Sequence, residues 1–325
     1  MRIQNFALSF ALLLPSANAA LTIASSLSVL EWTPQKIAAE DFASEILGGN
    51  ITFVNGGVAA LTNSSIDLAT NAETQALRSF SNNTSLRIIY TISEVAYRLL
   101  VDKRQIRSLK ELKGKRIGTI PTTSAGYFVQ KLLASAGLNS SEYTIVTGSP
   151  CNMEPCDNNT LPALLRAGRV DAVGLWEPAI ELCARVIGPQ NSLFFSDPSV
   201  YREIFSLHST TSKLANPTKR AEIISFIRAL EKSLKIFREH PERVYRRVAE
   251  AVTPKTEPEL LERVWDHHEW PGTIPSDIVD VLVEEDRDYI SREQNRTARG
   301  RKELGRLVDW GVLREVRREG EENNL

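Results

Sequence analysis

Residues 112–128 read Leu112-Lys113-Gly114-Lys115-Arg116-Ile117-Gly118-Thr119-Ile120-Pro121-Thr122-Thr123-Ser124-Ala125-Gly126-Tyr127-Phe128. The apolar run at 116–120 is typical of a short strand, whereas the apolar residues at 129, 132 and 133 follow a helical spacing. A Thr/Ser cluster at such a change of period is where a helix N-cap belongs. The hydroxyls therefore either only cap a helix or also bind a polar or anionic ligand at its positive end.

Similar changes of period recur on both sides of this stretch. Apolar runs that predict strands alternate with helical segments up to about residue 195, and from residue 218 the segments are mainly helical. The early strands are expected at 21–24, 51–54, 66–69 and 86–90. Such alternation indicates a parallel sheet flanked by helices, whose ligands sit at the carboxyl ends of the strands.

Composition limits the possible functions. The chain has 325 residues, is 42% hydrophobic and carries a net charge of −1, so it is long enough for two lobes and indicates neither disorder nor a polyanionic partner. The basic run at 314–318 is interspersed and followed by glutamates, so a solvated polar tail over 314–325 is preferred to a nucleic-acid site.

The N-terminus has the pattern of an export signal. Arg2 precedes an apolar run at 6–14, and Ala17-Asn18-Ala19 provides a cleavage site, so residues 1–19 are predicted to be a signal peptide of a secreted protein. A membrane anchor is the weaker alternative, because the run is too short to span a bilayer and no later segment is long enough.

Glycosylation sequons support this export route. Seven asparagines precede x-Ser/Thr, against roughly two or three expected by chance. They are Asn50, Asn63, Asn82, Asn83, Asn139, Asn158 and Asn295. Glycosylation is expected at all of them except Asn83.

The three cysteines predict one local disulfide. Cys151 and Cys156 bracket a turn-prone loop, and in an oxidising compartment they are expected to pair. Cys183 lies in an apolar helical run and is expected to be a buried free thiol. The cysteines lack histidines at ligand spacing, and His267 and His268 are adjacent, so no metal or other cofactor is expected.

Five segments of the chain form an ordered set of motifs: Ser65–Ala69, Leu109–Gly118, Thr123–Ala125, Ala163–Ala172 and Trp176–Pro178. Together they resemble the SsuA/THI5-like (NMT1/THI5) family of type II periplasmic solute-binding proteins. The resemblance suggests a secreted, fungal-like member and spans about residues 21–250. Pyrimidine synthases of this group carry a Cys-Cys-Cys-Phe-Cys run, which is absent here, and no lipobox cysteine follows the signal.

The resemblance implies a bilobal α/β fold, with two mixed or parallel sheets flanked by helices and a cleft between the lobes. The first lobe would hold residues 20–93 and 200–313, and the second 97–195. Polar and aromatic residues at strand ends would then line the cleft. The expected ligand-binding residues are Ser26, Trp32, Asn71, Glu73 and Ser93 on one wall, and Thr122, Thr123, Ser124, Tyr127, Trp176 and Glu177 on the other.

Three functions remain open at this point. The first is capture of a small polar or aromatic-stemmed metabolite, of the sulfonate, pyrimidine-precursor or amine class, by lobe closure. The second is a transferase or lyase that uses Glu73 or Glu177 as general base. The third is a partner-binding protein with a vestigial cleft. Two cleft carboxylates would suit an amine better than an anion, and the residues identify no transporter partner.

Overall fold

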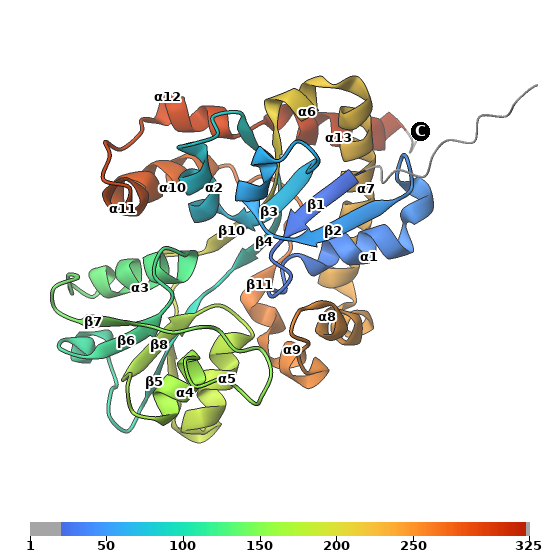
Figure 1. Cartoon of the computed structure of the whole chain (residues 1–325). Coiled ribbons are helices and arrows are strands. Elements are labelled where there is room, and N and C mark those ends of the chain that lie inside the picture. The colour runs from blue at the N-terminus through green and yellow to red at the C-terminus, as the bar shows by residue number, and fades with distance from the viewer. Residues whose placement is uncertain (1–20, 323–325) are drawn as a thin grey trace, which may run out of the picture.

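The computed structural model describes residues 21–322, which form two lobes, each built around one β-sheet (Figure 1). The predicted signal peptide, residues 1–19, lies outside the described residues. Each sheet is mixed and flanked by helices, as the sequence predicted.

The first lobe has a six-stranded sheet in the order β11-β4-β10-β3-β1-β2. Strands β2, β1 and β3 are parallel, and β10 runs antiparallel between β3 and β4. Every residue of β10 is buried, as expected for a strand in the middle of a sheet. The strands are β1 (Leu21–Ser25), β2 (Ile51–Asn55), β3 (Leu68–Ala72), β4 (Leu86–Val95), β10 (Glu203–Thr210) and β11 (His268–Glu269).

The second lobe has a five-stranded sheet in the order β7-β6-β8-β5-β9. Strands β7, β6 and β8 are parallel, whereas β5 is antiparallel to both β8 and β9. The strands are β5 (Arg98–Asp102), β6 (Arg116–Thr119), β7 (Thr144–Thr147), β8 (Ala172–Leu175) and β9 (Ser192–Phe195).

The chain passes between the lobes twice. It leaves the first lobe between β4 and β5, at residues 96–97, and returns between β9 and β10, at residues 196–202. The lobe boundaries expected from the sequence, 93–97 and 195–200, lie close to these passages. Because both passages are short, the two sheets meet where their connecting strands end.

Thirteen α-helices occur in the described part of the chain. Three belong to the second lobe: α3 (Ser124–Ser135), α4 (Leu161–Arg166) and α5 (Ala179–Ile187). The remaining helices are α1 (Thr33–Asp41), α2 (Glu73–Phe80), α6 (Thr211–Ala215), α7 (Pro217–Glu239), α8 (Tyr245–Ala251), α9 (Pro258–Val264), α10 (Ile278–Glu285), α11 (Ser291–Glu293), α12 (Arg301–Leu304) and α13 (Trp310–Glu322).

Helix α7 shows how the sequence pattern builds the core of the first lobe. Asn216 caps it by accepting a 3.1 Å hydrogen bond from the Lys219 N–H, and Pro217 occupies the first turn. Its buried apolar residues recur every three or four positions, and each contributes about 1.5–3 kcal/mol of burial free energy. The fully buried ones include Ile223, Ile227, Leu230, Leu234 and Phe237.

The predicted polar tail over 314–325 is corrected by the structure. Helix α13 continues through this region to Glu322, with Val316 buried in the core and Glu315 bound to the Arg220 guanidinium at 2.6 Å. Most residues after 313 are charged, so composition alone suggested a solvated tail. The few apolar residues of the helix nevertheless recur at helical spacing and pack against the core.

The cysteine predictions are confirmed. Cys151 and Cys156 form a disulfide, and Cys183 is a buried free thiol in α5. Among residues 21–322, no helix is both long and apolar enough to cross a membrane.

Candidate functional site

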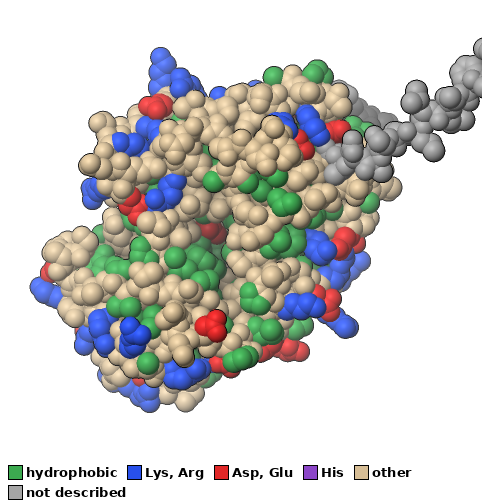
Figure 2. Space-filling view, viewed as in Figure 1, with side chains coloured by type: hydrophobic (Ala, Val, Ile, Leu, Met, Phe, Trp, Pro, Cys, Tyr) green, Lys and Arg blue, Asp and Glu red, His purple; other side chains and the backbone are tan. Residues whose placement is uncertain are grey.

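A cavity of about 200 Å³ lies where the two lobes face each other. Figure 2 shows the molecule hollowed between the lobes, with hydrophobic side chains gathered in the hollow. Loops after β1, β6 and β8, the ends of β3 and β10, and the passage after β4 all contribute side chains. The cavity is lined by Ser26, Val29, Glu31, Asn71, Gln75, Tyr97, Thr123, Ser124, Trp176, Glu203 and Phe205.

One side of the cavity is a hydrogen-bonded group around Glu203, the first residue of β10. The Tyr97 hydroxyl donates a 2.7 Å hydrogen bond to Oε1 of Glu203, and the Ser124 hydroxyl donates to the same oxygen at 3.3 Å. All three side chains are buried. Burial, followed by the negative charges of Glu31 and Glu73, raises the pKa of the Glu203 carboxyl well above its ordinary value.

A second acidic residue, Glu31, comes from the loop before α1 and is 1% exposed. Its Oε1 lies 3.4 Å from Nε2 of His268 in β11. Its other oxygen, Oε2, is buried without a hydrogen-bond partner among the described residues. A buried carboxylate oxygen without a donor is costly.

The Thr/Ser loop of the sequence forms the start of α3 and also lines the cavity. The Thr123 hydroxyl accepts a 3.2 Å hydrogen bond from the Ala125 N–H and donates at 2.6 Å to the Ile120 carbonyl. Thr122, just before it, has a φ of 63°, so the chain turns sharply at this point. Thr123 therefore combines helix capping with a place on the cavity wall, and Ser124 lines the same wall from the first position of the helix.

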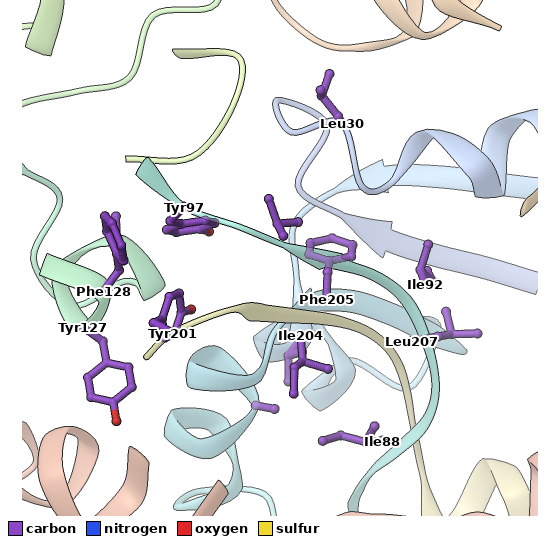
Figure 3. Packing of buried hydrophobic residues seen from close by; sticks show 14 of the residues in the cluster. Leu30, Ile88, Ile92, Tyr97, Tyr127, Phe128, Tyr201, Ile204, Phe205 and Leu207 are labelled. Carbon is purple, nitrogen blue, oxygen red and sulfur yellow. The ribbon is translucent and has the colours of Figure 1, made fainter. Parts of the chain in front are cut away.

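Aromatic side chains form the rest of the wall. The rings of Tyr97 and Trp176 lie 6.1 Å apart and both line the cavity, and Phe205 lines it from β10. Behind Tyr97, the rings of Phe128 and Tyr201 pack at 5.7 and 5.5 Å (Figure 3). This packing fixes the Tyr97 ring, with its hydroxyl beside both Ser124 and Glu203.

Hydrogen bonds join the lobes on two flanks of the cavity. On one flank, the Gln75 side chain in α2 donates a 3.0 Å hydrogen bond to the Thr122 carbonyl of the second lobe. On the other flank, the side chain of Asn152, inside the disulfide loop, donates at 2.6 Å to the Ser28 carbonyl. The lobes therefore contact each other around the cavity as well as at the strand passages.

Comparison with known proteins identifies the family. A family model described as NMT1/THI5 like matches residues 54–244, more than half of the chain. The chain belongs to the NMT1/THI5-like family. No curated protein matches it in sequence.

Solved structures share the fold of this NMT1/THI5-like chain. The alkanesulfonate-binding protein SsuA from Xanthomonas axonopodis pv. citri, bound to MOPS, has a TM-score of 0.66 at 18% identity, covering 90% of this chain and 98% of that one. The periplasmic aliphatic sulphonate binding protein SsuA from Escherichia coli has a TM-score of 0.68 at 14% identity, and the match covers 86% of this chain and 95% of that one. A Candida albicans gene product with the periplasmic binding protein fold has a TM-score of 0.55 at 14% identity, and the match covers 89% of this chain and 95% of that one. The bilobal type II fold is thereby confirmed.

The structure brings five of the eleven expected site residues together at the cavity. Four come from the first lobe's strand ends or the second lobe's strand-to-helix loop, where the sequence pattern was clearest, and the fifth, Trp176, directly follows β8. The five are Ser26, Asn71, Thr123, Ser124 and Trp176.

Three expected residues of the first lobe are placed outside the cavity lining. Trp32 is buried at the start of α1, with its ring 5.5 Å from Phe53. Glu73 is fully buried, and its oxygens accept hydrogen bonds from the Tyr201 hydroxyl at 2.9 Å and the Ile204 N–H at 2.6 Å. The Ser93 hydroxyl is turned into the sheet and donates to a backbone carbonyl of β11 at 3.0 Å.

Three expected residues of the second lobe are also outside the lining. Thr122 is exposed, and its carbonyl takes part in the interlobe bond already described. The Tyr127 ring packs 5.0 Å from that of Tyr289. Glu177 is buried against the Arg98 guanidinium, 2.6 Å away. Because Glu73 and Glu177 are both paired away from the cavity, neither is placed to act as the general base of an enzyme.

Six lining residues were missed: Val29, Glu31, Gln75, Tyr97, Glu203 and Phe205. The alternation of β10 could have indicated two of them, because Glu203 and Phe205 lie on one face of that strand. Tyr97 lies at the passage between the lobes, so its aromatic ring beside a predicted hinge was a further signal. Glu31 gave none, since a loop glutamate is ordinarily solvated. Among residues 21–322, no group of three or more His, Cys, Asp or Glu is arranged to hold a metal ion.

Proposed function

We propose that this chain is a solute-binding protein that takes a small polar or aromatic-stemmed metabolite into the interlobe cavity and closes its lobes on it. The observation that carries this proposal is a cavity whose polar and aromatic lining comes from both lobes. A ligand that touches both walls favours the closed arrangement by its differential affinity. Membership of the NMT1/THI5-like family and the sulfonate-binding neighbours support the same function.

Ligand size is set by the cavity. A volume of about 200 Å³ suits a single ring or a short chain with a polar group, since an engineered cavity of about 150 Å³ binds benzene. The exposed face of Trp176, which is only partly buried, offers a surface on which a planar stem can stack.

The proposal is tested by a thermal-shift screen with sulfonates, pyrimidines, amines and carboxylates. A ligand present at about 100 times its Kd adds about 2.7 kcal/mol to the free energy of unfolding. Trp176→Ala is expected to weaken binding about fivefold, because the loss of stacking costs on the order of 1 kcal/mol. Trp310→Ala, which removes the same side chain from α13 of the first lobe, is the matched control. Equal affinities in both variants would count against the cavity as the binding site.

Closure is tested separately by small-angle scattering. A ligand that binds between the lobes should reduce the radius of gyration, because it stabilises contacts across the cleft. Binding without any compaction would contradict closure while leaving the binding role intact.

We further propose that the protein is exported and glycosylated. The six asparagines at which glycosylation is expected, Asn50, Asn63, Asn82, Asn139, Asn158 and Asn295, are all exposed. A carbohydrate transferase can therefore reach them without unfolding the lobes. Protein secreted from a eukaryotic host should lose mass on enzymatic deglycosylation, and mass spectrometry should locate glycans at these positions. Unmodified asparagines in secreted protein would refute the glycosylation proposal.

A further inference from the structure

The cavity is unusual for an anion site because its charged residues are both acidic. Glu31 and Glu203 line it, and none of its lining residues among the described part of the chain is Lys or Arg. Both carboxyls are buried, at 1% and 5% exposure. A buried carboxyl group either keeps its proton, as the raised pKa of Glu203 indicates, or needs a partner of opposite sign.

The hydroxyl donors around the start of α3 are already engaged by the protein. The start of α3 and a nearby phenol are the natural anion-binding features of this wall. Yet the hydroxyls of Ser124 and Tyr97 both point to Oε1 of Glu203, and the Thr123 hydroxyl is taken by the Ile120 carbonyl. The side chain of Glu203 thus occupies the position that an anionic ligand group would take in an open site.

The second acidic residue lacks a donor. Oε1 of Glu31 faces His268, but Oε2 is buried without a partner among the described residues. Oε2 lacks a donor because none of the described side chains that line the cavity is Lys or Arg. An N–H group of a ligand that reaches the Glu31 carboxyl would supply the missing hydrogen bond.

The aromatic wall favours the same kind of ligand. Tyr97, Trp176 and Phe205 border the cavity beside the two carboxyls. A cation near an aromatic face gains about 0.5–1 kcal/mol at exposed sites and about 2 when desolvated. These rings also accept the apolar stem to which such a group is attached.

We propose that the ligand of this cavity is a small cation, a protonated amine or amidine on a short aromatic or apolar stem, whose N–H groups bind Glu31 and Glu203. This inference rests on the proposed solute-binding function and specifies its ligand class. It makes the site opposite in charge preference to the sulfonate ligands named for the structural neighbours.

The test uses three probes that share one stem: benzylammonium, benzyl alcohol and phenylmethanesulfonate. Binding is followed through the indole N–H resonance of Trp176, assigned with Trp176→Phe. We expect benzylammonium to shift this resonance with a Kd at least tenfold below that of phenylmethanesulfonate, with benzyl alcohol between them. Glu31→Gln should reduce that charge preference at least tenfold. Glu239→Gln, at an exposed glutamate that ends α7, should leave it unchanged.

Each outcome decides a different point. Tighter binding of phenylmethanesulfonate, with a saturable shift of Trp176, would overturn the cation inference and leave solute binding standing. No response of Trp176 to any of the three probes would overturn both proposals. If Glu31→Gln does not fold, Glu203→Gln tests the same preference, and a preference that survives in a folded variant of either residue refutes the assignment.

Discussion

The phenol of Tyr97 donates a 2.7 Å hydrogen bond to the carboxyl of Glu203. Tyr97 lies where the chain leaves the first lobe, and Glu203 lies where it returns, so one hydrogen bond joins the two passages. Both side chains are buried beside the cavity, where a polar group needs a hydrogen-bond partner. The geometry of the cavity and the pairing of the passages are therefore coupled through these two residues.

Tyr97→Phe is expected to lower the free energy of unfolding by about 1 kcal/mol, the usual net worth of one hydrogen bond. Because the hydroxyl lowers the pKa of Glu203 against the effect of burial, its removal should also raise that pKa further. Urea denaturation and carboxyl NMR of Glu203 measure the two effects. Tyr143→Phe, in the second lobe away from Glu203, is the control. If both variants lose the same free energy of unfolding, the hydrogen bond from Tyr97 to Glu203 does not stabilise the fold.

The buried carboxyls of Glu73 and Glu285 predict how the stability of the protein depends on pH. Burial, together with the charge of Glu73, raises the pKa of Glu285 well above its ordinary value of 4.5. The folded state therefore keeps a proton that the unfolded state releases above about pH 4.5. The contribution of this pair to the free energy of unfolding should fall as the pH rises from 4.5 toward the folded pKa.

Glu285→Gln removes one of these titrations while it keeps the size of the side chain. We expect the variant to be more stable than the natural chain at pH 8 but not at pH 5. Its stability should therefore change less between these two pH values. Thermal unfolding at both pH values measures this difference. Glu154→Gln is exposed and should keep the natural slope, and an equal slope in Glu285→Gln would contradict the interpretation.

The hydrogen bond from Gln75 to the Thr122 carbonyl predicts a kinetic effect on ligand release. Gln75→Ala removes a contact that crosses from one lobe to the other at the cavity edge. A loss of about 1 kcal/mol from the closed state should speed dissociation of a cavity ligand about fivefold. Stopped-flow measurement of release tests this expectation, with the exposed Gln190→Ala as control. Equal release rates would show that this bond does not hold the lobes closed.

Local pattern predicted the fold better than it predicted the orientation of side chains. The change of period around Thr123 located the β6–α3 turn, because capping depends on neighbours within a few residues. Glu73 also stands at a helix start, yet its carboxyl turns to the Ile204 N–H of β10. That contact joins residues 131 positions apart, so no local pattern carries it. The acidic cavity wall was missed for the same reason, since Glu203 reaches it only after the chain returns from the second lobe.

The disulfide loop predicts a role for Cys151 and Cys156 beyond stability. Between them, Asn152 donates to the Ser28 carbonyl, in the loop that also carries Glu31. The Thr256 hydroxyl donates at 2.9 Å to the Asn152 carbonyl and holds the loop from the other side. The disulfide therefore positions a contact that spans the two lobes.

Replacing both cysteines of this disulfide by serine should lower the free energy of unfolding by about 2 kcal/mol. Without the cross-link, the unfolded chain gains conformational entropy, which stabilises the unfolded state. Affinity for a cavity ligand should also fall, since the contact to the Ser28 carbonyl loosens. Asn152→Ala separates the two effects, because it keeps the disulfide and removes only the side-chain bond. Denaturation and titration of the same preparations measure both quantities. If the cysteine variant loses stability but both variants bind as tightly as the natural chain, the loop stabilises the second lobe without helping to close the cleft.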